Sequence, residues 1–258
     1  MLITIRYYGI EIPMYGLMIV IGCILGVLIA IRFNKREDIV QQDILFSCCY
    51  AGIGAFVGAK LLYLIITLPQ LINMTNPPEL SWGLISYLFS YGFVFYGGAL
   101  GGLLGVFIYA RQYQIAFFNL AETLILPIPL VHSIGRIGCF CAGCCYGRPM
   151  NPPWGVFFKE NSVAPQGIAL FPIQLFESAL NMILFIVLFI FSRKKRSDGQ
   201  VMGLYFTGYG IERFFLEYFR YDTERGIIAG LSTSQWISLI IIPIGIFLLL
   251  RSKIKKRN

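Results

Sequence analysis

Long apolar runs, each close to the length of one bilayer crossing, dominate the pattern of hydrophobic and polar positions. A helix needs roughly 20 mainly apolar residues to cross the hydrocarbon core. Runs of this kind lie at residues 13–33, 44–66, 88–110, 116–134, 171–192, 201–216 and 234–250. The weakest are the fourth, with Glu122, Pro127 and Pro129, and the sixth, with Glu212 and Arg213. Their length still favours a crossing, so we predict an all-α polytopic membrane protein with seven transmembrane helices.

Composition agrees with a chain embedded in a bilayer. Hydrophobic residues make up 57% of the chain and charged residues only 13%, against about 25% charged in soluble domains. Seven helices would use over half of the 258 residues, so we expect residues 1–258 to form a single membrane-embedded domain. No small-residue cleavage site follows the first apolar run, and we expect the first helix to be retained.

The distribution of lysine and arginine predicts the direction of insertion. Thirteen of the 21 basic residues lie in residues 32–43, at Arg111, in residues 193–196 and in the tail from Arg251. Because basic residues gather on the cytoplasmic side, the N-terminus is predicted outside and the C-terminus inside. The formal net charge of +8 is largely explained by these anchors, so no nucleic-acid partner is needed.

Two segments on the predicted outer side are longer than ordinary turns. Residues 67–87 contain three prolines, and residues 136–170 are rich in Gly, Pro and Cys. We expect them to form a small extracytoplasmic head, at about 136–170, and arms at the membrane surface. The glycine-rich runs at 52–58 and 97–102 favour close packing of helices.

Several charged side chains fall inside or near the predicted crossings, where they need partners or a polar cavity. They are Lys60, Glu122, Glu177, Glu212, Arg213 and Glu217. Arg213, Glu217 and Arg220 are spaced i, i+4 and i+7, which predicts one helical face, with Tyr209 one turn earlier. That face fits either a structural Glu–Arg pair or a functional site.

A second concentration of polar residues spans positions 132–148. Arg136 and Arg148 bracket a glycine-rich segment that we expect to be a turn. A guanidinium offers planar donors that match phosphate oxygens, so these arginines and Arg213 would make an anion site at headgroup depth. His132 is the only histidine, and such a residue is more often a satisfied polar group than a catalyst.

The same segment carries four cysteines, at positions 139, 141, 144 and 145. Their spacing differs from the paired C-x-x-C units of zinc sites, and the sequence has no second ligand cluster. We therefore predict no metal site. Adjacent Cys144 and Cys145 are hard to join to each other in a disulfide.

Residues 135–140, Gly-Arg-Ile-Gly-Cys-Phe, followed by Gly143 and Gly147-Arg148, resemble the signature of the prolipoprotein diacylglyceryl transferase family. Further similar elements occur in order at residues 14–18, 96–102, 171–177, 208–220 and 234–235. The resemblance covers nearly the whole chain.

The resemblance implies transfer of the diacylglyceryl group of phosphatidylglycerol to the lipobox cysteine of a prolipoprotein, without a cofactor, in the bacterial inner membrane. By motif position the expected catalytic residues are Arg136, Arg213, Tyr96 and Glu217, with Glu217 orienting Arg213. The expected substrate-binding residues are Tyr15, Arg136, Gly138, Cys139, Gly143, Gly147, Glu177 and Arg220. The expected partners are phosphatidylglycerol, the prolipoprotein signal peptide and membrane lipids.

The chain departs from the family pattern at four positions. Tyr96 and Phe171 stand where the family commonly has His, Cys139 where it has Asn, and Cys144 where it has Glu. These departures leave the general base open. We expect the arginines to favour the thiolate of the acceptor, with Tyr96 donating a hydrogen bond. A related transferase with another lipid or acceptor, a transporter, and a structural membrane subunit remain alternatives.

Overall fold

The computed structural model consists of two compact units, Met1–Asn34 with Glu122–Asn258 (the larger unit) and Lys35–Ala121 (the smaller unit). It describes residues 4–7, 10–34, 38–72, 82–83, 86, 88, 92–159, 162–194, 198–221 and 226–255. The arm expected at 67–87 therefore lies mostly outside the described residues, as do parts of the basic segments at 193–196 and after Arg251. A single domain over residues 1–258 stays a prediction.

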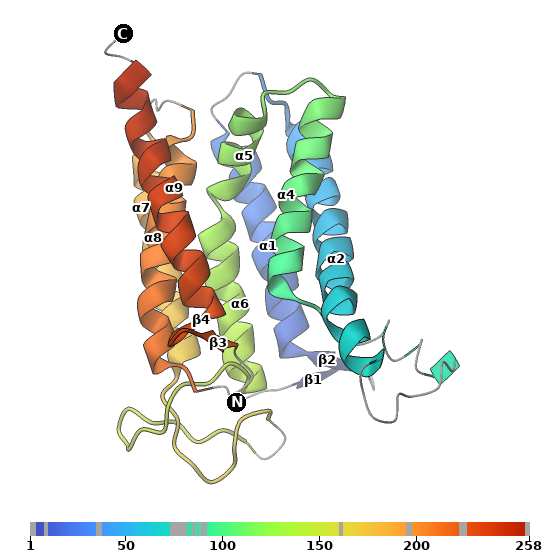
Figure 1. Cartoon of the computed structure of the whole chain (residues 1–258), viewed down its shortest axis with the longest axis vertical. Coiled ribbons are helices and arrows are strands. Elements are labelled where there is room, and N and C mark those ends of the chain that lie inside the picture. The colour runs from blue at the N-terminus through green and yellow to red at the C-terminus, as the bar shows by residue number, and fades with distance from the viewer. Residues whose placement is uncertain are drawn as a thin grey trace. The chain divides into compact units, whose positions relative to one another are not determined.

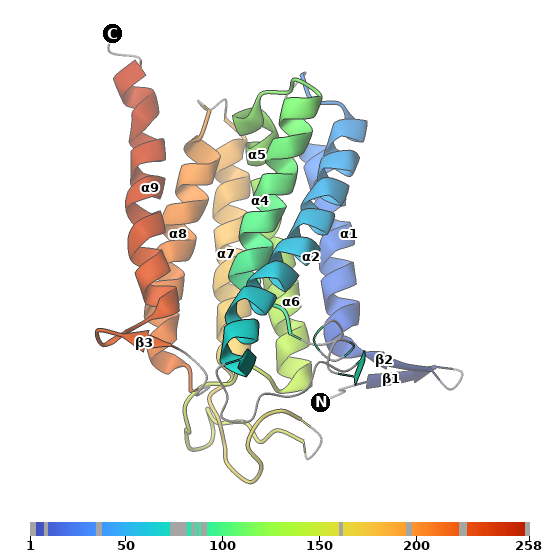
Figure 2. The ribbon, with the colours of Figure 1, turned by 45° about the vertical axis from the view of Figure 1, so that its right-hand side comes forward.

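Five helices make up most of the larger unit: α1 (Met14–Phe33), α6 (Ile128–Ala142), α7 (Ile173–Ser192), α8 (Gln200–Leu216) and α9 (Thr233–Lys255). Contacts join α1 to α6, α6 to α7, α7 to α8, and α8 to α9. Figures 1 and 2 show α7, α8 and α9 side by side. The chain enters α6 from the short helix α5 (Phe117–Ile125).

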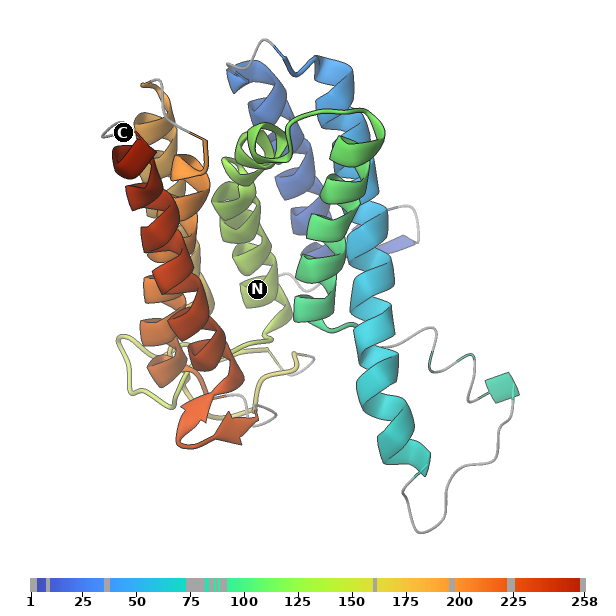
Figure 3. The same cartoon turned by 45° about the horizontal axis from the view of Figure 1, so that its top comes forward.

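Two helices, α2 (Gln41–Ile72) and α4 (Phe95–Gln112), pack along each other in the smaller unit (Figure 3). Glycines allow this close approach. A Cβ placed on Gly54 would collide with the carbonyl oxygen of Gly101, and one on Gly58 would collide with that of Gly97. Small residues bring membrane helices into backbone contact in this way. The packing role predicted for the glycine-rich runs is confirmed at these positions.

The fourth apolar run is not one straight helix. It breaks at Leu126–Pro127, and α6 then continues to Ala142, well past the predicted end at residue 134. Gly143 ends α6 in the left-handed conformation, with φ of 69°, where its N–H bonds back to the carbonyls of Cys139 and Phe140. The expected turn beginning at Arg136 is therefore wrong, because Arg136 lies in the helix and the chain turns only at Gly143.

Glu122 has a structural function at the start of α8. Its Oε1 accepts a hydrogen bond of 2.9 Å from the backbone N–H of Val201, in the first turn of that helix. A carboxylate stabilises the unpaired N–H groups and the positive end of the dipole at a helix N-terminus. The polar partner predicted for Glu122 is thus the N-terminus of α8.

The helices present large apolar side chains outward, as a protein in lipid does; Ile53, Phe95 and Leu100 are each about two-thirds exposed. Among the described residues, five segments are long and apolar enough to cross a membrane: Met14–Phe33, Gln41–Pro69, Phe117–Ala142, Ile173–Ser192 and Thr233–Arg251. The remaining two predicted crossings match α4 and α8, whose 18 and 17 residues rise only about 27 and about 26 Å. The structure supports a multi-pass membrane protein, and seven crossings stay a prediction.

Several loops gather at the end of the larger unit where α1, α7 and α9 begin and α6 and α8 end (Figure 1). The segment between α6 and α7 packs around Phe158, Ala164 and Leu170. Two antiparallel hairpins, which the all-α prediction lacked, lie at the same end. They consist of β1 (Thr4–Tyr7) with β2 (Ile10–Pro13), and β3 (Ile227–Ile228) with β4 (Leu231–Ser232).

The packing of α2 on α4 predicts unequal effects for two Gly→Ala substitutions. Gly101→Ala should destabilise the protein by about 1–3 kcal/mol, because the new methyl group meets backbone atoms that cannot move aside easily. Gly52→Ala on α2 should be neutral or stabilising, because no heavy atom lies within 4 Å of the added Cβ and alanine favours a helix. Thermal unfolding in detergent compares the two; equal midpoints would contradict close packing at Gly101.

Candidate functional site

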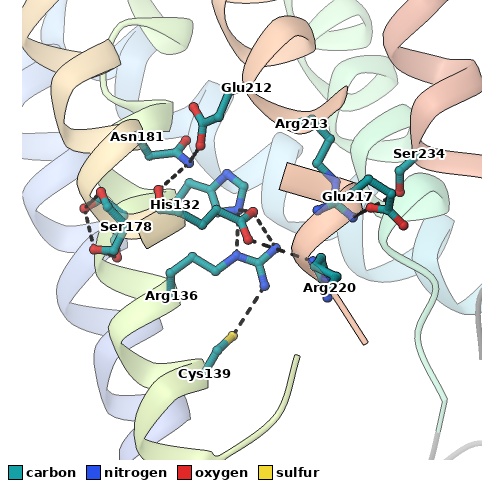
Figure 4. A network of polar contacts seen from close by, with 12 residues as sticks. His132, Arg136, Cys139, Ser178, Asn181, Glu212, Arg213, Glu217, Arg220 and Ser234 are labelled. Carbon is teal, nitrogen blue, oxygen red and sulfur yellow. Dashed lines mark hydrogen bonds and ion pairs between the residues drawn. The ribbon is translucent and has the colours of Figure 1, made fainter. Parts of the chain in front are cut away.

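Glu177, a buried carboxylate in the first turns of α7, is the shared partner of His132, Arg136 and Arg220. Figure 4 shows these three side chains close to one another in a polar network. Oε1 of Glu177 forms an ion pair of 2.9 Å with Nη2 of Arg136, and its Oε2 lies 3.8 Å from Nη1 of Arg220. Nε2 of His132 lies 3.5 Å from the same Oε1 and accepts a hydrogen bond of 3.2 Å from Nε of Arg136. Both ends of the carboxylate therefore face guanidinium groups.

A second ion pair lies at the end of α8. Nη2 of Arg213 is 3.0 Å from Oε2 of Glu217 and donates a hydrogen bond of 3.0 Å to Oγ of Ser234 in the first turn of α9. Within the part of the chain that the structure describes, Nη1 of Arg213 is buried without a hydrogen-bond partner. A buried unsatisfied donor costs about 1–3 kcal/mol, so this atom is a candidate contact for an anionic ligand.

The helical face predicted for Arg213, Glu217 and Arg220 is only half right. The i, i+4 pair between Arg213 and Glu217 forms as expected. However, α8 ends at Leu216, a 3₁₀ turn η1 (Glu217–Phe219) follows, and Arg220 is extended and bridges to Gly147. This change of direction turns Arg220 towards Glu177 and thereby joins the two parts of the network.

Other buried polar groups hold α6, α7 and α8 together around the ion pairs. Nδ2 of Asn181 donates to Oε1 of Glu212 at 2.6 Å and to the carbonyl of Glu177 at 2.9 Å. The hydroxyl groups of Ser133 and Ser178 each donate to the other's backbone carbonyl, at 2.8 and 2.9 Å. Polar bonds of this kind fix the register of helices that meet in an apolar medium.

Three of the four clustered cysteines come together below Arg136. The sulfurs of Cys139, Cys144 and Cys145 all lie within 4.8 Å of one another, whereas Cys141 is not in the group. Nη1 of Arg136 lies 3.8 Å from Sγ of Cys139. Sequence spacing did not predict this arrangement, because the turn at Gly143 brings the later cysteines back towards α6.

The motif glycines have clear backbone roles. A Cβ on Gly138 would lie 3.1 Å from the Cα of Tyr15, so Gly138 lets α6 approach the start of α1. A Cβ on Gly147 would lie 2.6 Å from the carbonyl oxygen of Phe171. Together with Gly143 at the end of α6, they shape the backbone around Arg136. Their expected contacts with substrate stay predictions.

The two tyrosines expected at the site lie in different units. Tyr15, at the start of α1, is 44% exposed, and its phenol is close enough to Arg136 and Cys139 for electrostatic interaction. Tyr96 lies in α4 of the smaller unit, so its predicted role stays a prediction.

Arg148, the second arginine of the segment 132–148, is exposed. The charged Lys60 has a polar partner within the smaller unit, because its Nζ donates a hydrogen bond of 3.2 Å to the carbonyl of Gly92.

An apolar groove of about 500 Å³ lies between α7 and α8, next to the polar network. Leu180, Leu184 and Val187 line it from α7, and Ile211 and Phe215 line it from α8. Glu212, which bonds to Asn181, is its acidic lining residue. A groove of this kind fits a hydrocarbon chain beside a charged headgroup.

Comparison with known proteins agrees with this combination of helices and buried charges. Residues 2–251 match the family model described as prolipoprotein diacylglyceryl transferase. A phosphatidylglycerol–prolipoprotein diacylglyceryl transferase of Clostridium tetani is 35% identical over 256 residues, covering 99% of both chains. Similar proteins with that name occur in Clostridium perfringens, 34% identical over 97% of this chain and 95% of its own, and in Clostridioides difficile, 34% identical over 92% and 90%.

The network predicts that Glu177 holds the larger unit together. Glu177→Gln should lower the free energy of unfolding by about 3–5 kcal/mol, because it removes the buried negative charge that faces Arg136 and Arg220. Asp198→Asn, at an exposed carboxylate before α8, is the matched control and should change stability little. Thermal unfolding of the purified proteins measures both, and an unchanged midpoint for Glu177→Gln would show that the arginines are held by other groups.

Proposed function

Because the chain belongs to the prolipoprotein diacylglyceryl transferase family, we propose that it transfers the diacylglyceryl group of phosphatidylglycerol to the cysteine thiol of a prolipoprotein. This is the first step of bacterial lipoprotein maturation. The structural observation that carries the proposal is the unsatisfied Nη1 of Arg213 beside the Arg136–Glu177 pair. A guanidinium held in place with a free donor suits a phosphate.

The donor lipid fits the two parts of the site. We infer that one acyl chain lies in the groove between α7 and α8, while the phosphate binds Arg136 and Arg213. Glu212 lines the groove and precedes Arg213 directly in the chain, so the apolar and charged parts adjoin. Glu217 orients Arg213 through their ion pair of 3.0 Å.

The reaction forms one bond and breaks one. The acceptor sulfur attacks the glycerol carbon that carries the phosphate ester, a carbon–sulfur bond forms, and the carbon–oxygen bond breaks. Glycerol phosphate leaves with the electron pair, and Arg136 and Arg213 stabilise the charge that builds up on its oxygens. The thiol proton must leave before or during attack, and the positive potential of the arginines favours the thiolate.

The remaining expected residues have supporting roles in this proposal. Tyr15, half exposed beside Arg136, donates to a lipid oxygen. Tyr96, in the smaller unit, keeps its predicted role of a hydrogen bond to the lipid or the thiol. Arg220, paired with Glu177, adds positive charge next to the phosphate site.

In the membrane, we propose seven crossings, with α4 and α8 completing the five longer segments. The N-terminus faces outside and the C-terminus the cytoplasm, because most basic residues then lie inside. The segment between α6 and α7 forms the head at the outer surface of the bacterial inner membrane. This places the polar network at headgroup depth, where phosphatidylglycerol and a secreted precursor meet.

An assay with purified protein tests the function and the arginines together. Incubation with phosphatidylglycerol and a lipobox peptide should add one diacylglyceryl mass to the peptide cysteine. Arg136→Lys and Arg213→Lys should each reduce the rate by about 100-fold or more, because an ammonium group cannot replace the fork of donors.

The matched control is Arg193→Lys, at the far end of α7, which should retain the normal rate. Gel filtration checks that each variant is folded. Near-normal rates for both Lys variants would show that Arg136 and Arg213 are structural. If the unmodified chain produced no mass gain on the peptide, the proposed function would be contradicted. If a gain appeared only with another lipid, that lipid would replace phosphatidylglycerol as the donor.

The orientation is tested by reporter fusions after Gln166, in the segment between α6 and α7, and after Lys194, just past α7. A phosphatase reporter active only outside the cytoplasm should be active after Gln166 and inactive after Lys194, because α7 carries the chain across once. A fluorescent reporter that folds only in the cytoplasm should give the opposite pattern. The same result at both positions would contradict the crossing by α7.

A further inference from the structure

The three clustered thiols have the arrangement of a metal-binding site. Sγ atoms of Cys139, Cys144 and Cys145 lie within 4.8 Å of one another. Cys139 is buried, whereas the two later cysteines are half-buried and so remain accessible to a small ligand. Three sulfur donors converge on one point there, and sulfur is the donor that Zn²⁺ and other thiophilic ions prefer.

The backbone creates this convergence at the end of α6. Gly143 takes the left-handed conformation, and the backbone N–H of Cys144 then donates 3.1 Å back to the carbonyl of Cys139. This capping turn sets Cys144 over the last turn of the helix. Cys145 is also left-handed, with φ of 58°, which is uncommon for a residue with a side chain.

Contacts from the rest of the larger unit hold residues 143–145, the cysteine turn, in place. Nε2 of Gln174, a fully buried residue of α7, donates 2.8 Å to the carbonyl of Cys144. The next residue, Tyr146, accepts a backbone hydrogen bond of 3.2 Å from Tyr221, and Gly147 bridges to Arg220. The turn is therefore preorganised by α6, α7 and the segment after α8, as a metal site requires.

The distances suit a metal ion better than a disulfide. With zinc–sulfur bonds of about 2.3 Å, tetrahedral geometry places two ligand sulfurs about 3.8 Å apart. The observed group needs to contract by about 1 Å at most to reach that geometry. A disulfide requires a separation of about 2.05 Å, and the adjacent Cys144 and Cys145 are poorly placed for one.

The charge balance also favours a dication. Three thiolates and one divalent ion carry a net charge of −1. Nη1 of Arg136, 3.8 Å from Sγ of Cys139, offsets that charge. Among the described residues the group has three members, so a tetrahedral ion keeps one position for a ligand from outside. Three protein ligands and an open position are typical of catalytic zinc.

We propose that Cys139, Cys144 and Cys145 bind one Zn²⁺-class ion, and that its open position takes the acceptor cysteine thiol, a step that rests on the proposed function. Coordination converts the thiol to a metal-bound thiolate and releases its proton to water. The site thereby supplies the activated sulfur next to Arg136, without a dedicated base. The cysteine turn would then bind the acceptor substrate in the active site.

Metal binding is measured without any reaction. The purified full-length chain, kept reduced and reconstituted with Zn²⁺, should hold one ion per chain by mass spectrometry after removal of unbound metal. With Co²⁺ it should show the near-ultraviolet absorption of thiolate-to-cobalt charge transfer. Cys144→Ser and Cys145→Ser should each lose at least 10-fold in affinity, whereas Cys141→Ser, on the same helix but outside the group, should bind normally.

Gel filtration and thermal unfolding establish that the Ser variants are folded, and Cys144→Ala provides a second test at that position. Less than about 0.1 ion per chain in the unmodified protein would overturn the site, because a true site binds its metal stoichiometrically. Equal binding by Cys141→Ser and Cys144→Ser variants, or a loss in Cys141→Ser alone, would also overturn it.

The open position is tested with the Co²⁺ form and no lipid donor. A lipobox peptide with its cysteine should increase the charge-transfer absorption, because a fourth thiolate joins the ion, and the same peptide with Ser in that place should not. No difference between the peptides would overturn acceptor binding by the ion. An increase together with no transfer in the complete assay would instead contradict the proposed function and leave the metal site standing.

Discussion

The buried carboxylate of Glu177 is the constraint on which the site depends. An ionised group inside a membrane protein must be compensated by opposite charge and hydrogen bonds, since an isolated charge is expensive in hydrocarbon. Here the compensation comes from Arg136 on α6 and Arg220 beyond α8. The ends of three consecutive elements are therefore drawn to one point, and the loops that follow them gather at the same end of the larger unit.

Contacts with neighbouring side chains fix the orientation of both arginines of the proposed phosphate site. Arg136 gives Nη2 to Glu177, Nε to His132 and Nη1 to the sulfur of Cys139, so its guanidinium is held in one orientation. Arg213 is held by Glu217 and Ser234 through a single nitrogen, Nη2, and its Nη1 stays unsatisfied. Electrostatic catalysis works best when donors are fixed before the reaction begins. A fixed pair of arginines with one open donor meets that condition.

Much of the fold could be predicted from the sequence, because apolar runs and small-residue patterns are local signals. The same holds for the Arg213–Glu217 pair, whose spacing of four residues is itself helical. The end of α6 could not be predicted, since residues 135–145 are rich in Gly and Cys in both helix and turn, and only tertiary packing selects Gly143 as the cap. Contacts between distant segments could not be predicted either, because the spacing of residues does not encode them. An example is the hydrogen bond from the Val201 N–H to Glu122.

Three of the four departures from the family pattern lie in the larger unit around the turn after α6, whereas the fourth, Tyr96, lies in the smaller unit. Cys139 and Cys144 replace an asparagine and a glutamate of the familiar motif, and both lie in the cluster completed by Cys145. Phe171 replaces a histidine, and its carbonyl accepts from the N–H of Gly147, two residues after Cys145. At Cys139 and Cys144 an amide and a carboxylate are thus replaced by thiols in one turn beside Arg136, and sulfur is the donor that the proposed Zn²⁺-class ion prefers.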